Sequence, residues 1–310
     1  MTRHGIAVDL TTRIGTVELP NPVMTASGTS GHGAELAAYF DLAALGAVVV
    51  KSLSVDPWPG NAPPRLKPVA GGMLNSVGLQ GPGVAMWLER DLPALEAAGA
   101  RVVVSIWGRR TKDYARAAAL LASASRAIVA VEVNVSCPNL DDGREMFARS
   151  PAATAGAVEA AGAARLPRWV KLSPGSANLV EVAAAALDAG AAALTLVNTL
   201  PGLAIRADLR RSALGGGGGG LSGPALHAVA LRTVAEVATA LPEVPIVGVG
   251  GVMSGWQAVE FLLAGARAVQ VGTATLLDPR APLRILTELQ RWCAANRVER
   301  VADLVGGARD

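Results

Sequence analysis

Residues 102–136 read VVVSIWGRRTKDYARAAALLASASRAIVAVEVNVS, and this stretch decides the fold class. It begins with an apolar, β-branched run at 102–107, continues with an Ala/Leu-rich segment of helical character at 111–122, and ends with a second apolar run at 129–136. Nearly continuous apolar runs of this length are typical of parallel strands buried on both faces of a sheet. The stretch therefore predicts one strand–helix–strand unit of an α/β protein.

The same alternation repeats along the whole chain, and it predicts eight strands and eight helices. Eight such units in 310 residues are typical of a (β/α)8 TIM barrel, whereas the alternative, an open doubly wound sheet, usually has fewer units. No linker or shift in composition divides the chain, so we expect one domain over 1–310. Residues 6–10 and 16–19, with a turn at 13–15, predict a short N-terminal β-hairpin that closes the bottom of the barrel. The predicted strands are 22–27, 47–53, 102–107, 129–136, 169–173, 193–198, 245–249 and 268–272, and the predicted helices are 34–45, 85–98, 111–122, 152–165, 179–189, 224–241, 255–264 and 282–296.

Composition excludes several classes of protein. With 51% hydrophobic and 17% charged residues, the chain has the material for a large core and is not disordered. The uncharged runs 68–88 and 212–231 are interrupted by Gly and Pro, so we expect no membrane span. The first ten residues lack an apolar signal core, which predicts a cytoplasmic protein. A net charge of +3 from scattered basic residues does not indicate a nucleic-acid partner, and two cysteines and three histidines without ligand spacing predict no metal site.

Scarce polar residues are concentrated at the ends of the predicted strands. Only four of the 28 basic residues are lysines, and two of them, Lys51 and Lys171, fall within apolar runs, where an unpaired cation is costly. Asn134, Asn139 and Asn198 lie at strand ends or just after them. Because the carboxyl ends of the strands form the active-site face of this fold, these side chains predict a site for a planar polar ligand there.

Glycine motifs predict a phosphate-binding site at the same face. Gly248-Val249-Gly250-Gly251 ends the seventh strand and Gly272-Thr273 ends the eighth, where loops of this fold commonly bind phosphate through backbone N–H groups. Ser222-Gly223, before the sixth helix, offers another donor. The six consecutive glycines at 215–220 predict either a flexible hinge or lid or an inert surface loop.

Cys137 is the candidate for proton transfer or nucleophilic attack. It follows the fourth strand, between Asn134 and Asn139, and starts a long loop. No histidine lies nearby in the sequence to activate a nucleophile, so the pattern favours a thiol that abstracts a proton. The alternative is a small buried thiol that fills space. Cys293, within an apolar helical pattern, is expected to be inert packing.

These residues belong to motifs that resemble those of the class 1 dihydroorotate dehydrogenases, FMN-dependent barrel enzymes of pyrimidine synthesis. The most specific motif is NVSCPN at 134–139. Cysteine rather than serine at position 137, and the lack of an N-terminal membrane-associating helix, favour class 1 over the quinone-using class 2. The other matching segments follow in the family's order: NPVMTASG at 21–28, GN at 60–61, PR at 64–65, GMLNSVGLQ at 72–80, NT at 198–199, GGLSGPA at 219–225 and GVGG at 248–251.

The resemblance implies oxidation of (S)-dihydroorotate to orotate in de novo UMP biosynthesis, with Cys137 as the base that removes the C5 proton while hydride passes from C6 to N5 of FMN. Lys51 would bridge flavin and substrate, and Lys171 would lie at the pyrimidine edge of the flavin, where a cation stabilises the reduced form. The implied substrate residues are Lys51, Asn75, Val77, Gly78, Leu79, Asn134, Asn139, Asn198 and Thr199. The implied FMN residues are Ser27, Lys51, Ser52, Ser105, Asn134, Lys171, Val197, Gly223, Gly250, Gly251, Gly272 and Thr273.

The segment 72–80 most resembles subclass 1B, in which a second subunit carrying FAD and an iron–sulfur cluster passes electrons to NAD⁺. Two cysteines cannot hold a cluster, so any cluster would lie on that subunit. We expect a homodimer, because members of this family usually pair. Departures from the family pattern at Gly81, in the loop 141–148 and in the glycine run concern loop closure and the exact substrate. Three alternatives stay open: another dihydropyrimidine oxidoreductase with a related barrel and cysteine, a flavin-binding subunit with mainly an assembly role, which the altered loop suggests, and a phosphate-binding isomerase or aldolase on the same barrel.

Overall fold

The computed structural model describes residues 8–137, 146–176 and 178–308. Its centre is a sheet of eight parallel strands in the order β3-β16-β15-β10-β9-β8-β7-β4. A parallel bridge between Met24 and Ala47 joins the two outer strands, and the Thr25 amide donates to the Ala47 carbonyl at 3.3 Å. The predicted (β/α)8 barrel is thereby confirmed. Its strands are β3 (Val23–Thr25), β4 (Val48–Val49), β7 (Val102–Ile106), β8 (Ile128–Asn134), β9 (Arg168–Leu172), β10 (Ala193–Leu196), β15 (Ile246–Val249) and β16 (Ala268–Val271).

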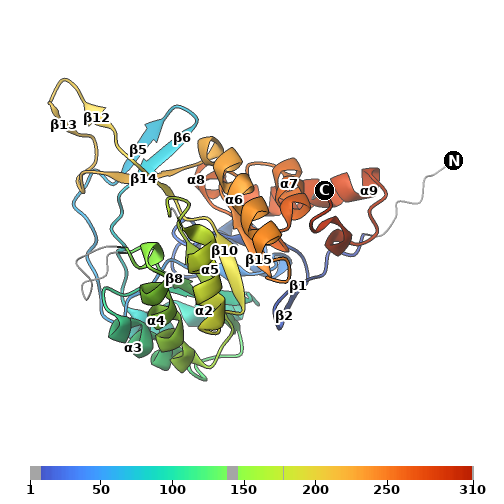
Figure 1. Ribbon diagram of the computed structural model, residues 1–310, viewed down its shortest axis with the longest axis horizontal. Coiled ribbons are helices and arrows are strands. Elements are labelled where there is room, and N and C mark those ends of the chain that lie inside the picture. The colour runs from blue at the N-terminus through green and yellow to red at the C-terminus, as the bar shows by residue number, and fades with distance from the viewer. Residues whose placement is uncertain (1–7, 138–145, 177, 309–310) are drawn as a thin grey trace.

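Helices cover the outside of the barrel (Figure 1). The predicted helix 34–45 is wrong: the segment forms two 3-10 helices, η1 (Glu35–Ala38) and η2 (Leu42–Ala44), because the Asp41 carboxylate accepts from the Ala43 amide and starts a new turn. The predicted helix 85–98 divides at Asp91, where Pro93 lacks the N–H that a continuous helix needs. The helices are α1 (Val84–Arg90), α2 (Leu92–Ala97), α3 (Thr111–Leu121), α4 (Pro151–Ala161), α5 (Leu179–Asp188), α6 (His227–Ala240), α7 (Gly255–Ala264), α8 (Thr273–Leu277) and α9 (Ala281–Ala295), with short 3-10 turns η3 (Phe147–Arg149), η4 (Gly162–Ala164), η5 (Pro224–Leu226) and η6 (Val301–Leu304). Within the described ranges, no helix is both long and apolar enough to cross a bilayer.

The N-terminal hairpin closes the bottom of the barrel, as predicted, but its first strand is β1 (Thr12–Ile14). Of the predicted strand 6–10, residues 6 and 7 lie outside the described residues, and residues 8–10 form only an isolated bridge from Asp9 to Arg300. Strand β1 pairs with β2 (Val17–Leu19) through a turn in which Gly15 has a φ of +59°, a conformation that favours glycine. Ile14, Val17 and Leu19 join a core cluster with side chains from the inside of the barrel. Within that cluster they pack with Met24, Ala47, Val49, Val103, Ala130, Trp169, Ala193, Val247 and Ala268.

A second, antiparallel sheet lies at the other end of the barrel, built from the long segments that follow β4 and β10. Its order is β11 (Leu200–Gly202), β14 (Gly219–Ser222), β6 (Gly72–Asn75) and β5 (Leu66–Val69). Figure 1 shows this sheet, with the small β12 (Ile205–Arg206) and β13 (Arg211–Ser212) pair beyond it, at the opposite end of the molecule from β1 and β2.

Most of the six-glycine run packs closely against neighbouring segments: at Gly215, Gly216, Gly219 and Gly220 a Cβ would lie within 2.5 Å of another residue, whereas Gly217 faces open space. These positions are not an inert surface loop, and the hinge or lid stays a prediction. A Cβ on Gly215 would overlap the Ala62 carbonyl oxygen, and one on Gly220 would overlap the Thr199 hydroxyl. Gly219 and Gly220 lie within β14 and pair with Gly202 and Pro201 of β11. The small residues therefore bring this strand close to the top of the barrel.

Candidate active site

A cavity of about 260 Å³ opens at the carboxyl ends of the barrel strands, beneath the second sheet. The barrel supplies its floor and walls, while β5, β6 and the residues after β6 supply its cover. Polar groups gather here because the carboxyl ends of the strands face this space. The lining residues are Ala26, Ser27, Gly28, Thr29, Lys51, Ser52, Leu66, Met73, Asn75, Val77, Gly78, Leu79, Asn134, Ser136, Lys171, Val197, Asn198, Thr199, Ser222, Gly223, Leu226, Val249, Gly250, Gly251, Gly272, Thr273 and Leu276.

Most of the site residues predicted from the sequence line this one cavity. Ser105 and Cys137 do not; Ser105 is fully buried and its Oγ lies 2.9 Å from the Ser52 Oγ, so it supports a lining residue from behind. Asn139 lies outside the described residues. The predicted residues that line the cavity are Ser27, Lys51, Ser52, Asn75, Val77, Gly78, Leu79, Asn134, Lys171, Val197, Asn198, Thr199, Gly223, Gly250, Gly251, Gly272 and Thr273.

Two asparagines, one at the end of β8 and one after β10, are joined by a hydrogen bond above the intervening strand β9. The Asn198 Nδ2 donates to the Asn134 Oδ1 at 3.2 Å, and the Asn134 Nδ2 donates to the Ser52 Oγ at 3.3 Å. The Asn198 Oδ1 also accepts from the Thr199 amide at 2.8 Å. Above them, Asn75 donates to the Gly220 carbonyl at 3.2 Å, which ties the cover to the glycine strand. These bonds fix the amides while they leave donor and acceptor capacity towards the cavity.

Lys51 and Lys171 bring two cations to the same floor. Burial and, to a lesser extent, repulsion from Lys171 lower the pKa of Lys51 from 10.5 to about 8. Lys51 therefore exchanges its proton near pH 8. Below that pH the Lys51 cation suits an anionic ligand.

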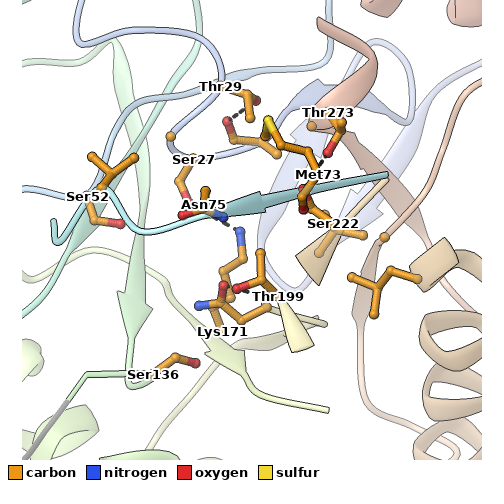
Figure 2. Close-up of a pocket in the computed structure, with 18 of the residues that line it drawn as sticks. Ser27, Thr29, Ser52, Met73, Asn75, Ser136, Lys171, Thr199, Ser222 and Thr273 are labelled. Atoms are coloured by element: carbon orange, nitrogen blue, oxygen red, sulfur yellow. Dashed lines mark hydrogen bonds between the residues drawn. The ribbon is translucent and has the colours of Figure 1, made fainter. Parts of the chain in front are cut away.

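Lys171 is held by a buried network that the sequence reasoning missed. Its Nζ donates to the Ser27 Oγ and the Gln270 Oε1, each at 3.2 Å, and lies 3.6 Å from the Glu132 Oε1. Gln270 in turn donates to the Glu132 Oε2 at 2.8 Å. Glu132 and Gln270 are both 0% exposed, and Figure 2 shows the Lys171 side chain pointing from below towards Ser27. A fixed, charge-balanced lysine results at the cavity floor.

Glycine loops form the far end of the cavity. Within the described part of the chain, the backbone N–H groups of Gly223, Gly250, Gly251 and Gly272 make no hydrogen bond. Gly250 and Gly251 have φ values of +142° and +66°, and a Cβ on either would lie within 2.7 Å of the Ala230 or His227 Cβ. Only glycine fits here, and its free N–H groups are those that a phosphate accepts from.

Cys137 lies behind the cavity rather than in it. It is 0% exposed, and its sulfur lies 3.0 Å from the Gly108 carbonyl oxygen and 3.0 Å from the Tyr114 hydroxyl. Burial raises the pKa of the thiol from 9.0 to about 11, so at neutral pH it is protonated. Its neighbour Ser136 lines the cavity, and the Ser136 hydroxyl has no hydrogen-bond partner among the described residues.

Strand alternation explains both the residues that were missed and the position of the thiol. Along β8 and just beyond it, Val131, Val133, Val135 and Cys137 belong to the core cluster that includes the helices, whereas Glu132, Asn134 and Ser136 alternate with them. Asn134 and Ser136 line the cavity, and Glu132 contacts Lys171. Polar residues recur at every second position from Glu132 to Ser136, and this alternation would have predicted that Glu132 and Ser136 lie on the same face of the strand as Asn134.

Comparison with known proteins agrees with this geometry. Residues 9–292 match the family model described as dihydroorotate dehydrogenase. The catalytic subunit of dihydroorotate dehydrogenase B (NAD(+)) from Geobacter sulfurreducens is 45% identical over 96% of this chain and 97% of its own length. The subunit of the same name from Pelobacter propionicus is 45% identical over 96% of this chain and 98% of its own length. The one from Alkaliphilus oremlandii is 43% identical over 99% of this chain and 99% of its own length. The chain belongs to the dihydroorotate dehydrogenase family.

Proposed function

We propose that this chain oxidises (S)-dihydroorotate to orotate, the dehydrogenation step of pyrimidine biosynthesis. The observation that carries the proposal is the convergence of Asn75, Asn134, Asn198 and two lysines on one cavity whose far end is a glycine cradle. Dihydroorotate is an anion rich in ring N–H and carbonyl groups, so amides and cations are the partners that it needs. The names of the relatives point to the same substrate.

We infer that the cofactor is FMN, because the cavity fits it at both ends. The free N–H groups of Gly223, Gly250, Gly251 and Gly272, with Thr273, would hold the ribityl phosphate. Ser27, Ser52, Asn134 and Val197 would contact the flavin, Ser105 would support Ser52, and Lys171 would lie at its pyrimidine edge. When bound, FMN supplies the acceptor for the hydride that leaves C6.

The substrate would bind between the flavin and the cover. Asn75, Asn134, Asn198 and Thr199 would bind the ring, with backbone groups of Val77, Gly78 and Leu79, and Lys51 would contact both substrate and flavin. Asn139 completes the proposed set. The Ser136 hydroxyl faces the same space and lacks a protein partner within the described ranges, so it can also bond to the substrate.

We propose Cys137 as the base. Its thiolate would take the proton from C5, so that an S–H bond forms as the C5–H bond breaks; the electron pair left on C5 forms the C5=C6 double bond as hydride leaves C6. In the structure the sulfur faces Gly108 and Tyr114, behind Ser136. The proposal therefore requires the Cys137 side chain to turn towards the cavity when it acts.

We further propose that a second subunit, which carries FAD and an iron–sulfur cluster, takes electrons from this chain to NAD⁺, and that the chain is a cytoplasmic homodimer. The relatives are named catalytic subunits of an enzyme that uses NAD(+), which implies a partner. Both cysteines here are buried and free, so neither is available for a cluster.

The test is anaerobic mixing of the flavin-loaded chain with dihydroorotate or with dihydrouracil. We expect dihydroorotate to bleach the flavin faster, since dihydrouracil lacks the carboxylate that the lysines would attract. Cys137→Ala should slow the bleaching by about 10²–10⁴-fold, the usual contribution of a general base. Faster reduction by dihydrouracil would contradict the substrate, and a wild-type rate in Cys137→Ala would contradict the base.

A further inference from the structure

The surroundings of the Cys137 sulfur consist mainly of hydrogen-bond acceptors. The Gly108 carbonyl oxygen lies at 3.0 Å and the Asn134 carbonyl oxygen at 3.5 Å, and neither can donate. The third neighbour is the Tyr114 hydroxyl at 3.0 Å. A protonated thiol is satisfied here, because it can donate to Gly108, but a thiolate would face two carbonyl dipoles.

The Tyr114 hydroxyl can reverse this situation with one rotation. It now donates its proton to the Asn134 carbonyl at 2.9 Å, so towards the sulfur its oxygen acts as an acceptor. Once the thiol has lost its proton, the same O–H can turn from Asn134 to the sulfur, since the heavy atoms are already at hydrogen-bond distance. Among the described residues, it is the hydroxyl placed to do this.

The aromatic ring of Tyr114 is held rigidly in that place. Tyr114 is 0% exposed on α3 and makes an edge-to-face contact with Phe147, whose ring centroid lies 5.3 Å away. Phe147 also donates its backbone amide to the Cys137 carbonyl at 3.2 Å. The tyrosine, the phenylalanine and the cysteine thus form one packed unit.

We propose that Tyr114 is a positioning residue for Cys137: in the position seen here its hydroxyl supplies the hydrogen bond that stabilises the thiolate, before the side chain turns towards the cavity. This inference rests on the proposed role of Cys137 as base. It assigns to a buried residue of α3, which does not line the cavity, a part in making the thiolate available.

The charged and titratable groups around the sulfur support this role. Burial raises the pKa of Tyr114 well above 10, so its hydroxyl keeps its proton at working pH. The Asp113 carboxylate, which accepts from the amides of Arg109 and Arg110 at 3.0 Å each, opposes the thiolate by repulsion. Against burial and Asp113, the hydrogen bond with the Tyr114 hydroxyl favours the charged sulfur and lowers the pKa of Cys137.

The experiment measures single-turnover flavin reduction by dihydroorotate in Tyr114→Phe, Cys137→Ala and the double variant. A hydrogen bond to a charged group is worth about a tenfold change in equilibrium or more, so Tyr114→Phe should reduce the rate about tenfold at pH 8. If the tyrosine acts through the thiol, the same change should have no further effect in the Cys137→Ala protein. The matched control is Tyr39→Phe. Tyr39 is the only other tyrosine of the chain and is half-exposed, so this variant should keep the wild-type rate.

A second readout follows the thiol itself. Because the chain has two cysteines, Cys293→Ala leaves Cys137 as the single site for ¹³Cβ-cysteine NMR. Between pH 8 and 10.5 the resonance should begin to move towards the thiolate position, and Tyr114→Phe should reduce that movement by about tenfold. An unchanged titration, or an equal loss of rate with and without Cys137, would overturn the proposal. If Cys137→Ala alone keeps the wild-type rate, the base assignment fails, and the NMR titration still decides whether Tyr114 stabilises the thiolate.

Discussion

The buried pair Glu132 and Lys171 gives the sharpest test of how the cavity floor is built. Glu132→Gln keeps the shape of the side chain and removes its charge, so that Lys171 loses its countercharge 3.6 Å away. At an effective dielectric constant of about 20, two unit charges at that distance attract by roughly 4–5 kcal/mol. Removing one partner of a buried ion pair leaves an unpaired buried charge, which strongly destabilises the folded state. We therefore expect the free energy of unfolding of Glu132→Gln to be about 3 kcal/mol lower than that of wild type.

The assay is urea unfolding of the flavin-free chain, supported by thermal unfolding. For a chain of this size, about 3 kcal/mol corresponds to a fall of roughly 5 °C in Tm. The matched control is the double variant Glu132→Gln, Lys171→Met, which removes both charges and should be more stable than Glu132→Gln alone. If Glu132→Gln were as stable as wild type, or if the two changes were simply additive, the reasoning that these charges act as a unit would be refuted.

Two further predictions concern Lys51 and the glycine strand. Because burial lowers the pKa of Lys51 to about 8, its cation is present below that pH and lost above it. Orotate binding, measured by titration against the flavin spectrum, should therefore weaken progressively from pH 7 to 9. The variant Lys51→Met should bind orotate weakly at every pH in this range. Gly220→Ala places a Cβ on the Thr199 hydroxyl, whereas a Cβ on Gly218 would lie 3.4 Å from the Gly202 oxygen. Gly220→Ala should therefore weaken orotate binding by about 1–3 kcal/mol, and Gly218→Ala should leave it near wild type; equal affinities in the two variants would contradict the close packing.

The barrel could be predicted from the sequence because its strands are apolar on both faces and its helices are rich in alanine and leucine. All eight strands lie within two residues of their predicted positions except β4, whose predicted range 47–53 shortens to Val48–Val49. Local backbone chemistry caused the errors in the helices: Asp41 started a new turn and Pro93 divided a helix. The predictions treated these segments by their average composition, which hides single residues.

The cavity could be predicted in part because strand ends collect at one face. Lysines, asparagines and glycines at those ends came together as expected, since the topology dictates it. The orientation of Cys137 could not be read from its place in a motif, because one position along the chain turns a side chain to the other face. Glu132 and Gln270 were overlooked since they lie in mid-strand, although a polar residue within an apolar run was the same signal that identified Lys171.

The central claim is that this cavity converts dihydroorotate into orotate with two electrons passed to a bound flavin. The most direct measurement is one anaerobic turnover of the purified, FMN-loaded chain with excess (S)-dihydroorotate, with orotate counted by its absorbance against the flavin bleached. We predict one orotate for each flavin reduced, without any added acceptor. A flavin that stays oxidised, or one that bleaches without orotate being formed, would contradict the claim.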